Sequence, residues 1–247
     1  MNELTAAADT YLTDVSDVLQ AAIRRNRQAI AQAGQLLADA FTRDGLAFVF
    51  GSGHSHIFAE EAFYRAGGAV RICPILKPDY MLHDGAHRST QLERQHGLAK
   101  DVLAGYEFVA GRDVMVVVSN SGANPLPVEV AQRAAELGMT VIAITSLQYA
   151  KESRADGIRL HEVADLVLDN GCPPGDALVT LSDDLPRVGP GSSVVGLALL
   201  NAVIVDGLAR QVAAGTRPDV YLSAGMPGAA KHNAEFGVRF AERIPHI

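Results

Sequence analysis

Apolar residues follow two patterns along the chain, a helical one at the start and a strand-like one further on. Residues 3–43 contain no proline and place apolar side chains at helical spacing, which predicts a long helix or a helical hairpin. Asp44 and Gly45 end this segment. Further along, the apolar residues come in short continuous runs. These runs predict strands over residues 46–50, 70–75, 113–118, 140–145 and 166–168.

Stretches with helical periodicity separate or follow the predicted strands. They cover residues 55–66, 126–137, 192–213 and 232–243. Apolar strands that alternate with helices are typical of a parallel sheet covered on both faces. We therefore predict a three-layer α/β/α sandwich around a five-stranded, flavodoxin-like parallel sheet. The sequence shows no solenoid repeat and no low-complexity linker, so we expect a helical segment over residues 1–44 that packs on one domain over residues 45–247.

Two loops that follow predicted strands combine glycines with hydroxyl side chains. They span residues 51–55 (Gly-Ser-Gly-His-Ser) and residues 119–124 (Ser-Asn-Ser-Gly-Ala-Asn). Ligands of parallel α/β sheets bind beyond the carboxyl ends of the strands, and glycines and hydroxyls at a helix start suit a phosphate monoester. One such loop is more often only a turn and helix cap, but two at successive strand ends favour a phosphate site. His56 stands where a dinucleotide motif needs its third glycine, which disfavours nucleotide binding.

Composition narrows the classes of partner and compartment. The chain has 21 basic and 28 acidic residues and a net charge of −7, which disfavours nucleic-acid binding. Cys73 and Cys172 lack disulfide or zinc spacing, so we expect reduced thiols. The acidic start is unlike a signal peptide, and the apolar run 194–205 is shorter than the roughly 20 residues of a membrane span. We therefore expect a cytoplasmic protein with no membrane partner.

The second loop and its surroundings resemble the sugar isomerase (SIS) domain. The resemblance rests on residues 116–124, with Ala134, Gly138 and residues 142–146 behind them, and extends over roughly residues 45–215. SIS domains bind phosphosugars through a Ser-x-Ser-Gly-x-Ser/Thr loop, in which this chain has Asn124 at the last position. An amide can still donate to a phosphate oxygen. The resemblance implies a sugar phosphate ligand, no cofactor, and substrate contacts from Ser52, Gly53, His54, Ser55, Ser119, Asn120, Ser121, Asn124, Ser146, Ser192 and Ser193.

Two glutamates and one histidine are the candidates for acid–base chemistry. The segment with Glu60 and Glu61 resembles both sedoheptulose-phosphate isomerases and N-acetylmuramic acid 6-phosphate etherases, in which the glutamate matching Glu61 is the base. Glu93 follows the irregular residues 76–92 and resembles the second glutamate of the etherases; we expect it to open a helix, where a capping-box acid is the alternative interpretation. SIS dimers often complete a site with a histidine or acid from the neighbouring subunit, so His232 is a candidate, although it is equally well a helix-start histidine without a role.

Four histidines are the candidates for a metal site. The spacings of four histidines would let imidazoles converge, but nothing in the sequence joins their two loops, so we expect no metal at His54, His56, His83 and His87.

SIS domains serve isomerases, lyases and sensors. Glu61 and Glu93 in etherase-like segments favour a lyase or dehydratase that removes the C2 proton of an N-acetylhexosamine 6-phosphate. An aldose–ketose isomerase and a non-catalytic sensor are the alternatives, and the sensor lacks an accompanying DNA-binding motif.

Overall fold

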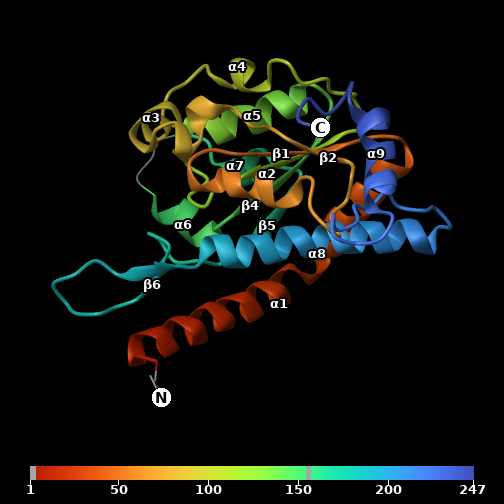
Figure 1. The fold of residues 1–247 in the computed structure, drawn as a ribbon. Coiled ribbons are helices and arrows are strands. Elements are labelled where there is room, and N and C mark those ends of the chain that lie inside the picture. Colours follow the sequence, from red (N-terminus) through yellow and green to blue (C-terminus); the bar gives the residue numbers. More distant parts are fainter. Residues whose placement is uncertain (1–3, 154–156) are drawn as a thin grey trace.

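The computed structural model describes residues 4–153 and 157–247 (Figure 1). The first half of the chain contains α1 (Ala6–Thr42), β1 (Ala47–Gly51), η1 (His54–His56), α2 (Ile57–Ala62), β2 (Ile72–Pro74), η2 (Pro78–Tyr80), η3 (Leu82–Asp84), α3 (Ala86–Leu92), α4 (Ala99–Leu103) and β3 (Val114–Val118). The second half contains α5 (Pro125–Glu136), β4 (Thr140–Thr145), α6 (Leu147–Glu152), α7 (Leu160–Val163), β5 (Leu166–Asp169), β6 (Ala177–Val179), β7 (Val188–Pro190), α8 (Ser192–Ala213) and α9 (Ala229–Phe240).

The described residues form a five-stranded parallel sheet in the order β2-β1-β3-β4-β5. Successive side chains of a strand point to opposite faces, so each strand supplies both apolar layers. In β1, Phe48 and Phe50 pack on the side of α4, α5, α7 and α9, whereas Ala47 and Val49 pack on the side of α1, α2 and α8. Burial on both faces explains the continuous apolar runs. The predicted fold class, a three-layer sandwich with an N-terminal helix, is confirmed.

The leading segment is one helix rather than a hairpin. Figure 1 shows α1 and α8 side by side on one face of the sheet, with the first turns of α1 extending beyond it. A Cβ on Gly207 of α8 would lie 3.1 Å from the Leu37 Cβ and 3.2 Å from the Gly34 carbonyl oxygen of α1. Small residues therefore let the two helices approach closely.

Helix α8 corrects one expectation drawn from the sequence. The apolar run 194–205 belongs to a helix of 22 residues, and α8, alone among the helices of the described part, is long and apolar enough to cross a membrane by length and composition. Buried core helices pass the same test. Val195, Leu199 and Val203 of α8 are buried against α1 and the sheet, which accounts for its apolar character.

Three local predictions were wrong in detail. Helix α2 ends at Ala62, four residues before the expected end, and Tyr64 beyond it is left-handed with φ of 46°. Residues 76–92, expected to be irregular, contain two 3-10 turns and α3. Glu93 ends α3 instead of opening a helix. In addition, β6 and β7 form an antiparallel hairpin that the pattern did not predict.

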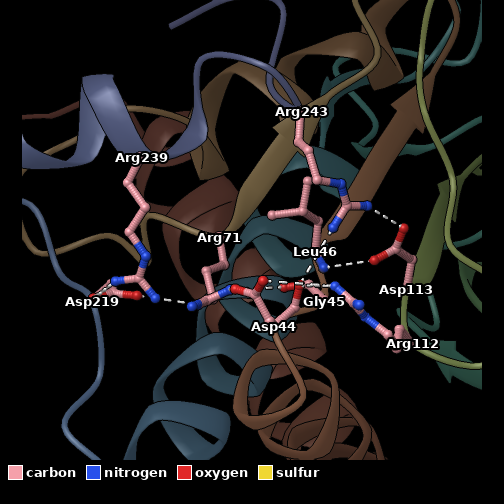
Figure 2. A network of polar contacts seen from close by, with 9 residues as sticks. All are labelled: Asp44, Gly45, Leu46, Arg71, Arg112, Asp113, Asp219, Arg239 and Arg243. Carbon is pink, nitrogen blue, oxygen red and sulfur yellow. Dashed lines mark hydrogen bonds and ion pairs between the residues drawn. The ribbon is translucent and has the colours of Figure 1, made fainter.

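A polar network closes the amino ends of the strands (Figure 2). Asp113, directly before β3, has no exposed side-chain surface; it accepts hydrogen bonds from the Leu46 amide at 2.9 Å and from Arg243 Nη2 at 2.6 Å. Arg71, also buried, pairs with Asp44 at 2.7 Å and with Asp219 at 3.1 Å. Figure 2 shows that these pairs link the C-terminal segment to the residues that precede β1 and β3. The carboxyl ends of the same strands are left to the glycine- and serine-rich loops.

Both cysteines are free thiols, as predicted, and both are buried. Burial raises the pKa of the Cys73 thiol and that of the Cys172 thiol to about 12. A thiol with so high a pKa is a poor nucleophile and a poor metal ligand at neutral pH. Neither cysteine is therefore a candidate for chemistry.

Candidate functional site

The two predicted phosphate loops leave neighbouring strands at the point where the strand order reverses. β1 pairs with β2 on one side and with β3 on the other, and the loops 51–55 and 119–124 follow β1 and β3. In a sheet of this order, the crevice between these two strand ends is the usual ligand site. The structure thus places both loops at one switch point.

Glu93 lies between these loops. Ser52 Oγ donates a hydrogen bond to Glu93 Oε2 at 3.0 Å, and the Asn124 side chain hydrogen-bonds the same carboxyl group. The Leu126 amide, at the start of α5, donates to the Glu93 carbonyl oxygen at 3.2 Å. One residue at the end of α3 therefore contacts both loops.

Local backbone geometry makes this approach possible. Gly53 has φ of 55°, a backbone conformation that other residues rarely adopt, whereas a Cβ there would meet Glu93 Oε2 only in ordinary van der Waals contact at 3.5 Å. In the middle of α3, the fully buried Ser89 hydroxyl donates to the Tyr80 carbonyl oxygen at 2.8 Å, which attaches the helix to the preceding turn. A left-handed glycine and a buried serine thus position the carboxyl group.

Burial raises the pKa of Glu93 above its usual value, and hydrogen bonds from Ser52 and Asn124 and the charge of Arg94 oppose the rise. A glutamate whose pKa is raised toward neutrality is suited to general acid–base chemistry. The capping-box interpretation of Glu93 is wrong, because α3 starts at Ala86 and Glu93 lies at its other end. Its carboxyl group is thus free of helix capping and faces the loops.

The second loop is a tight turn that depends on Gly122. This residue has φ of 58°, its amide donates to the Ser119 carbonyl oxygen at 3.1 Å, and a Cβ there would lie 2.8 Å from Thr145 Oγ1. Ser119 is buried and Ser121 is half-buried at the rim. Asn120 is turned toward the neighbouring strand ends, where its Oδ1 accepts from Asn170 Nδ2 at 3.0 Å. Its contacts tie the loop to the end of β5.

The two adjacent glutamates of α2 point in different directions. Glu61 pairs with Arg65 one turn later, and its Oε1 accepts from Asn201 Nδ2 of α8 at 3.4 Å. Glu60 Oε2 lies 3.7 Å from His56 Nε2, beside the first loop. Glu61 therefore faces α8, and Glu60 faces the histidine.

Several predicted ligand residues make structural contacts. Ser146 is fully buried, caps α6 by accepting from the Tyr149 amide, and donates to the Cys172 carbonyl oxygen at 2.6 Å. The Ser192 hydroxyl donates to Asp176 Oδ2 at 2.6 Å at the start of α8. These bonds account for both hydroxyls without a ligand. Ser193 and Ser55 are half-buried, and His54 is exposed at the loop edge.

His232 is held by the C-terminal segment. Its Nε2 lies 2.9 Å from the Val220 carbonyl oxygen, and its ring packs edge-on against Phe236. Figure 1 shows α9, which carries His232, on the opposite side of the molecule from α3, which leads to Glu93. Within one chain, the structure does not bring His232 and Glu93 together.

Two polar residues near the loops were missed by sequence reasoning. Thr145 ends β4 and Asn170 directly follows β5, and both are buried. Thr145 Oγ1 donates to the Asn120 carbonyl oxygen, and Asn170 Nδ2 donates to Asn120 Oδ1. Their signal was available, because each stands at the carboxyl end of an apolar run, as Ser52 and Ser119 do.

A family model of the SIS domain matches residues 10–146. This chain belongs to the SIS domain family. The matched part begins within α1 and reaches the end of the second loop and β4. The resemblance inferred from the serine loop is therefore confirmed.

Relatives and neighbours of this SIS protein agree with the fold. A UPF0309 protein of Brucella anthropi is 41% identical over 244 residues, which cover 99% of this chain and 100% of that protein. A phosphoheptose isomerase from Francisella tularensis superposes with a TM-score of 0.54 at 16% identity, covering 81% of this chain and 95% of that one. The Vibrio vulnificus NanR protein, solved in complex with ManNAc-6P, gives a TM-score of 0.53 at 16% identity over 94% of this chain and 69% of its own. At such identities the two structures show a shared fold.

Proposed function

We propose that this SIS protein binds an N-acetylhexosamine 6-phosphate at the β1/β3 switch point, removes its C2 proton and eliminates a group from C3. The observation that carries the proposal is the Glu93 carboxyl group, which contacts both Gly/Ser loops and whose pKa is raised by burial. A titratable group perturbed in this way at a ligand crevice is typical of a functional site.

The ligand class is supported by the chemistry of the loops. Ser119 and Ser121 place hydroxyl donors just before α5, and Ser55 places one in the loop after β1, whereas the Ser52 hydroxyl and the Asn124 side chain bond Glu93 in the free protein. Such donors can hold one phosphate although the chain carries a net charge of −7. The ManNAc-6P bound by NanR, which shares the fold, is a sugar phosphate of the proposed class.

The proposed reaction assigns different roles to two glutamates. Glu61 accepts the C2 proton of the open-chain sugar as general base; this role rests on the etherase- and isomerase-like segment that carries it, since its contacts in the free protein are with Arg65 and Asn201. Glu93, whose pKa is raised by burial, donates a proton to the oxygen that leaves C3 as the C2–C3 double bond forms. An N-acetyl group on C2 blocks aldose–ketose exchange, so the carbanion formed at C2 either regains a proton there or expels the oxygen on C3.

The experiment is incubation of the protein with a panel of sugar 6-phosphates in D₂O, followed by proton NMR and mass spectrometry. We expect deuterium at C2 and loss of water or another C3 group from an N-acetylated substrate. A ketose phosphate as the only product would identify an isomerase instead. A sugar phosphate that binds in calorimetry but returns unchanged would identify a sensor. Either result would overturn the lyase proposal.

We further propose a cytoplasmic homodimer in which residues 1–44 form a helical segment on the domain of residues 45–247. Exposed apolar side chains on α1 and α8, among them Leu12 and Val205, support a second copy as partner. In such a dimer, His232 of the partner subunit would complete the site. Light scattering after size-exclusion chromatography at micromolar concentration should give twice the 26.1 kDa chain mass. A monomer would overturn the shared site.

A further inference from the structure

The loop after β1 is joined to the turns that follow β2. The Gly53 amide donates to the Tyr80 carbonyl oxygen at 3.0 Å, and Gly53 forms an isolated parallel bridge with Met81. This connection was not evident in the sequence, where the absence of a link between the two loops argued against a metal. In the structure it brings the rings of His56 and His83 to a centroid distance of 6.0 Å.

The orientation of His56 leaves one ring nitrogen available. Its Nδ1 hydrogen-bonds the Gly53 carbonyl oxygen, which can only accept, so Nδ1 carries the proton. The lone pair of the neutral ring is therefore on Nε2. Metal-binding histidines are commonly oriented by such a carbonyl contact at the other nitrogen. The side chain is also buried, with 8% exposure, so this geometry is held by packing.

A carboxylate and a second imidazole face this nitrogen. Glu60, one helical turn after His56, places Oε2 3.7 Å from Nε2. One ligand atom from each of His56, Glu60 and His83 can be chosen so that all three lie within 4.8 Å of one another. Glu60 and His83 are exposed, so small rotations can bring their atoms around a common centre.

We propose that His56, Glu60 and His83 form a binding site for one divalent transition-metal ion of the zinc class. Imidazole ligands favour Zn²⁺ over Mg²⁺ or Ca²⁺, which take oxygen ligands. Zinc is usually four-coordinate, with ligand distances of about 2.0–2.2 Å, so three protein ligands leave one position for water or a ligand oxygen. The site shares its loop with Ser52 but uses none of the residues that contact Glu93. It therefore stands independently of the sugar-phosphate proposal.

The test is equilibrium Zn²⁺ binding to the purified full-length chain, measured by competition with a chromophoric chelator and by metal analysis after dialysis. Two exposed ligands are removed separately in Glu60→Gln and His83→Ala, which spares the buried His56. His87→Ala, an exposed histidine outside the cluster, is the matched control. Circular dichroism and thermal melts of each variant in EDTA establish that the folds are equivalent.

We expect about one Zn²⁺ per chain for the wild type and the control, and at least about tenfold weaker binding for both ligand variants. Substitution of Co²⁺ should give visible ligand-field bands that both variants lose. The proposal is overturned if the wild type binds no stoichiometric Zn²⁺, if either ligand variant binds as tightly as the wild type, or if His87→Ala weakens binding as much as His83→Ala.

Discussion

The Ser52 hydroxyl donates a 3.0 Å hydrogen bond to Glu93 Oε2 across 41 positions of sequence. This contact joins the loop after β1 to the end of α3, and Asn124 extends the connection to the loop after β3. Burial raises the pKa of Glu93, and hydrogen bonds that stabilise its carboxylate lower it. The contact with Ser52 therefore positions Glu93 and limits the rise of its pKa.

Removal of each proposed catalytic carboxyl group should affect a different step. Glu61→Gln should abolish solvent exchange at C2, because no base remains. Glu93→Gln should retain exchange but slow elimination by roughly 10²- to 10⁴-fold, the usual cost of a lost general acid. Proton NMR of one sample measures the rate of C2 exchange and the rate of elimination separately. Glu235→Gln, at an exposed position on α9, is the control. Normal turnover by Glu93→Gln would exclude its role as the acid.

The raised pKa of Glu93 predicts a pH-dependent stability cost. An unfolded glutamate titrates near 4.5, and burial moves the native pKa above this value. The native state therefore binds more protons than the unfolded state between these two pKa values, and stability decreases as pH rises through that interval. Glu93→Gln keeps an acceptor for Ser52 but cannot ionise.

Thermal melts should therefore show Glu93→Gln to be more stable than the wild type at pH 7.5. The difference should shrink toward pH 4, where the wild-type carboxyl group is largely protonated in both states. Glu235→Gln should show no comparable change between the two pH values. A difference between Glu93→Gln and wild type that is independent of pH would mean that ionisation of Glu93 is not its cause.

Ser121 is the rim hydroxyl of the second loop and is predicted to bind phosphate. Ser121→Ala should weaken sugar 6-phosphate binding by about 1–3 kcal/mol, roughly 5- to 150-fold, as expected for a lost hydrogen bond to a charged group. Calorimetry with the phosphorylated and unphosphorylated sugar measures this, and the exposed Ser223→Ala serves as control. Equal wild-type affinity for both sugars would refute a phosphate site.

The pair between Asp113 and Arg243 should hold the C-terminal segment on the sheet. Asp113→Ala leaves the Leu46 and Val109 amides without their acceptor and the partly buried Arg243 guanidinium without its carboxylate partner. Urea unfolding should give a loss of about 3–5 kcal/mol at unchanged m-value, the usual cost of breaking a buried pair. As control, Arg133→Ala removes only an exposed ion pair with Glu136 and should cost less than about 1 kcal/mol. Similar losses in both variants would contradict a structural role for the network.

Short polar helices were the main failure of sequence-based prediction. Residues 86–92 carry little apolar periodicity, so α3 was expected to be irregular, and Glu93 was assigned to a helix start. The helix forms because Ser89 bonds the Tyr80 carbonyl oxygen and the chain beyond it packs against the start of α5. Such contacts between separate segments leave no period in the sequence.

The sequence alone determined the sheet, the long helices α1 and α8, and the positions of both Gly/Ser loops at strand ends. These features follow from local requirements: apolar runs must be buried on both faces, and glycine permits backbone conformations that other residues resist. Tertiary structure alone decided which polar groups meet. It placed Glu93 against Ser52, turned Glu61 toward Asn201 and brought His83 opposite His56. Such encounters depend on how loops close over the folded sheet, because residues far apart in sequence come together only when the intervening elements have packed.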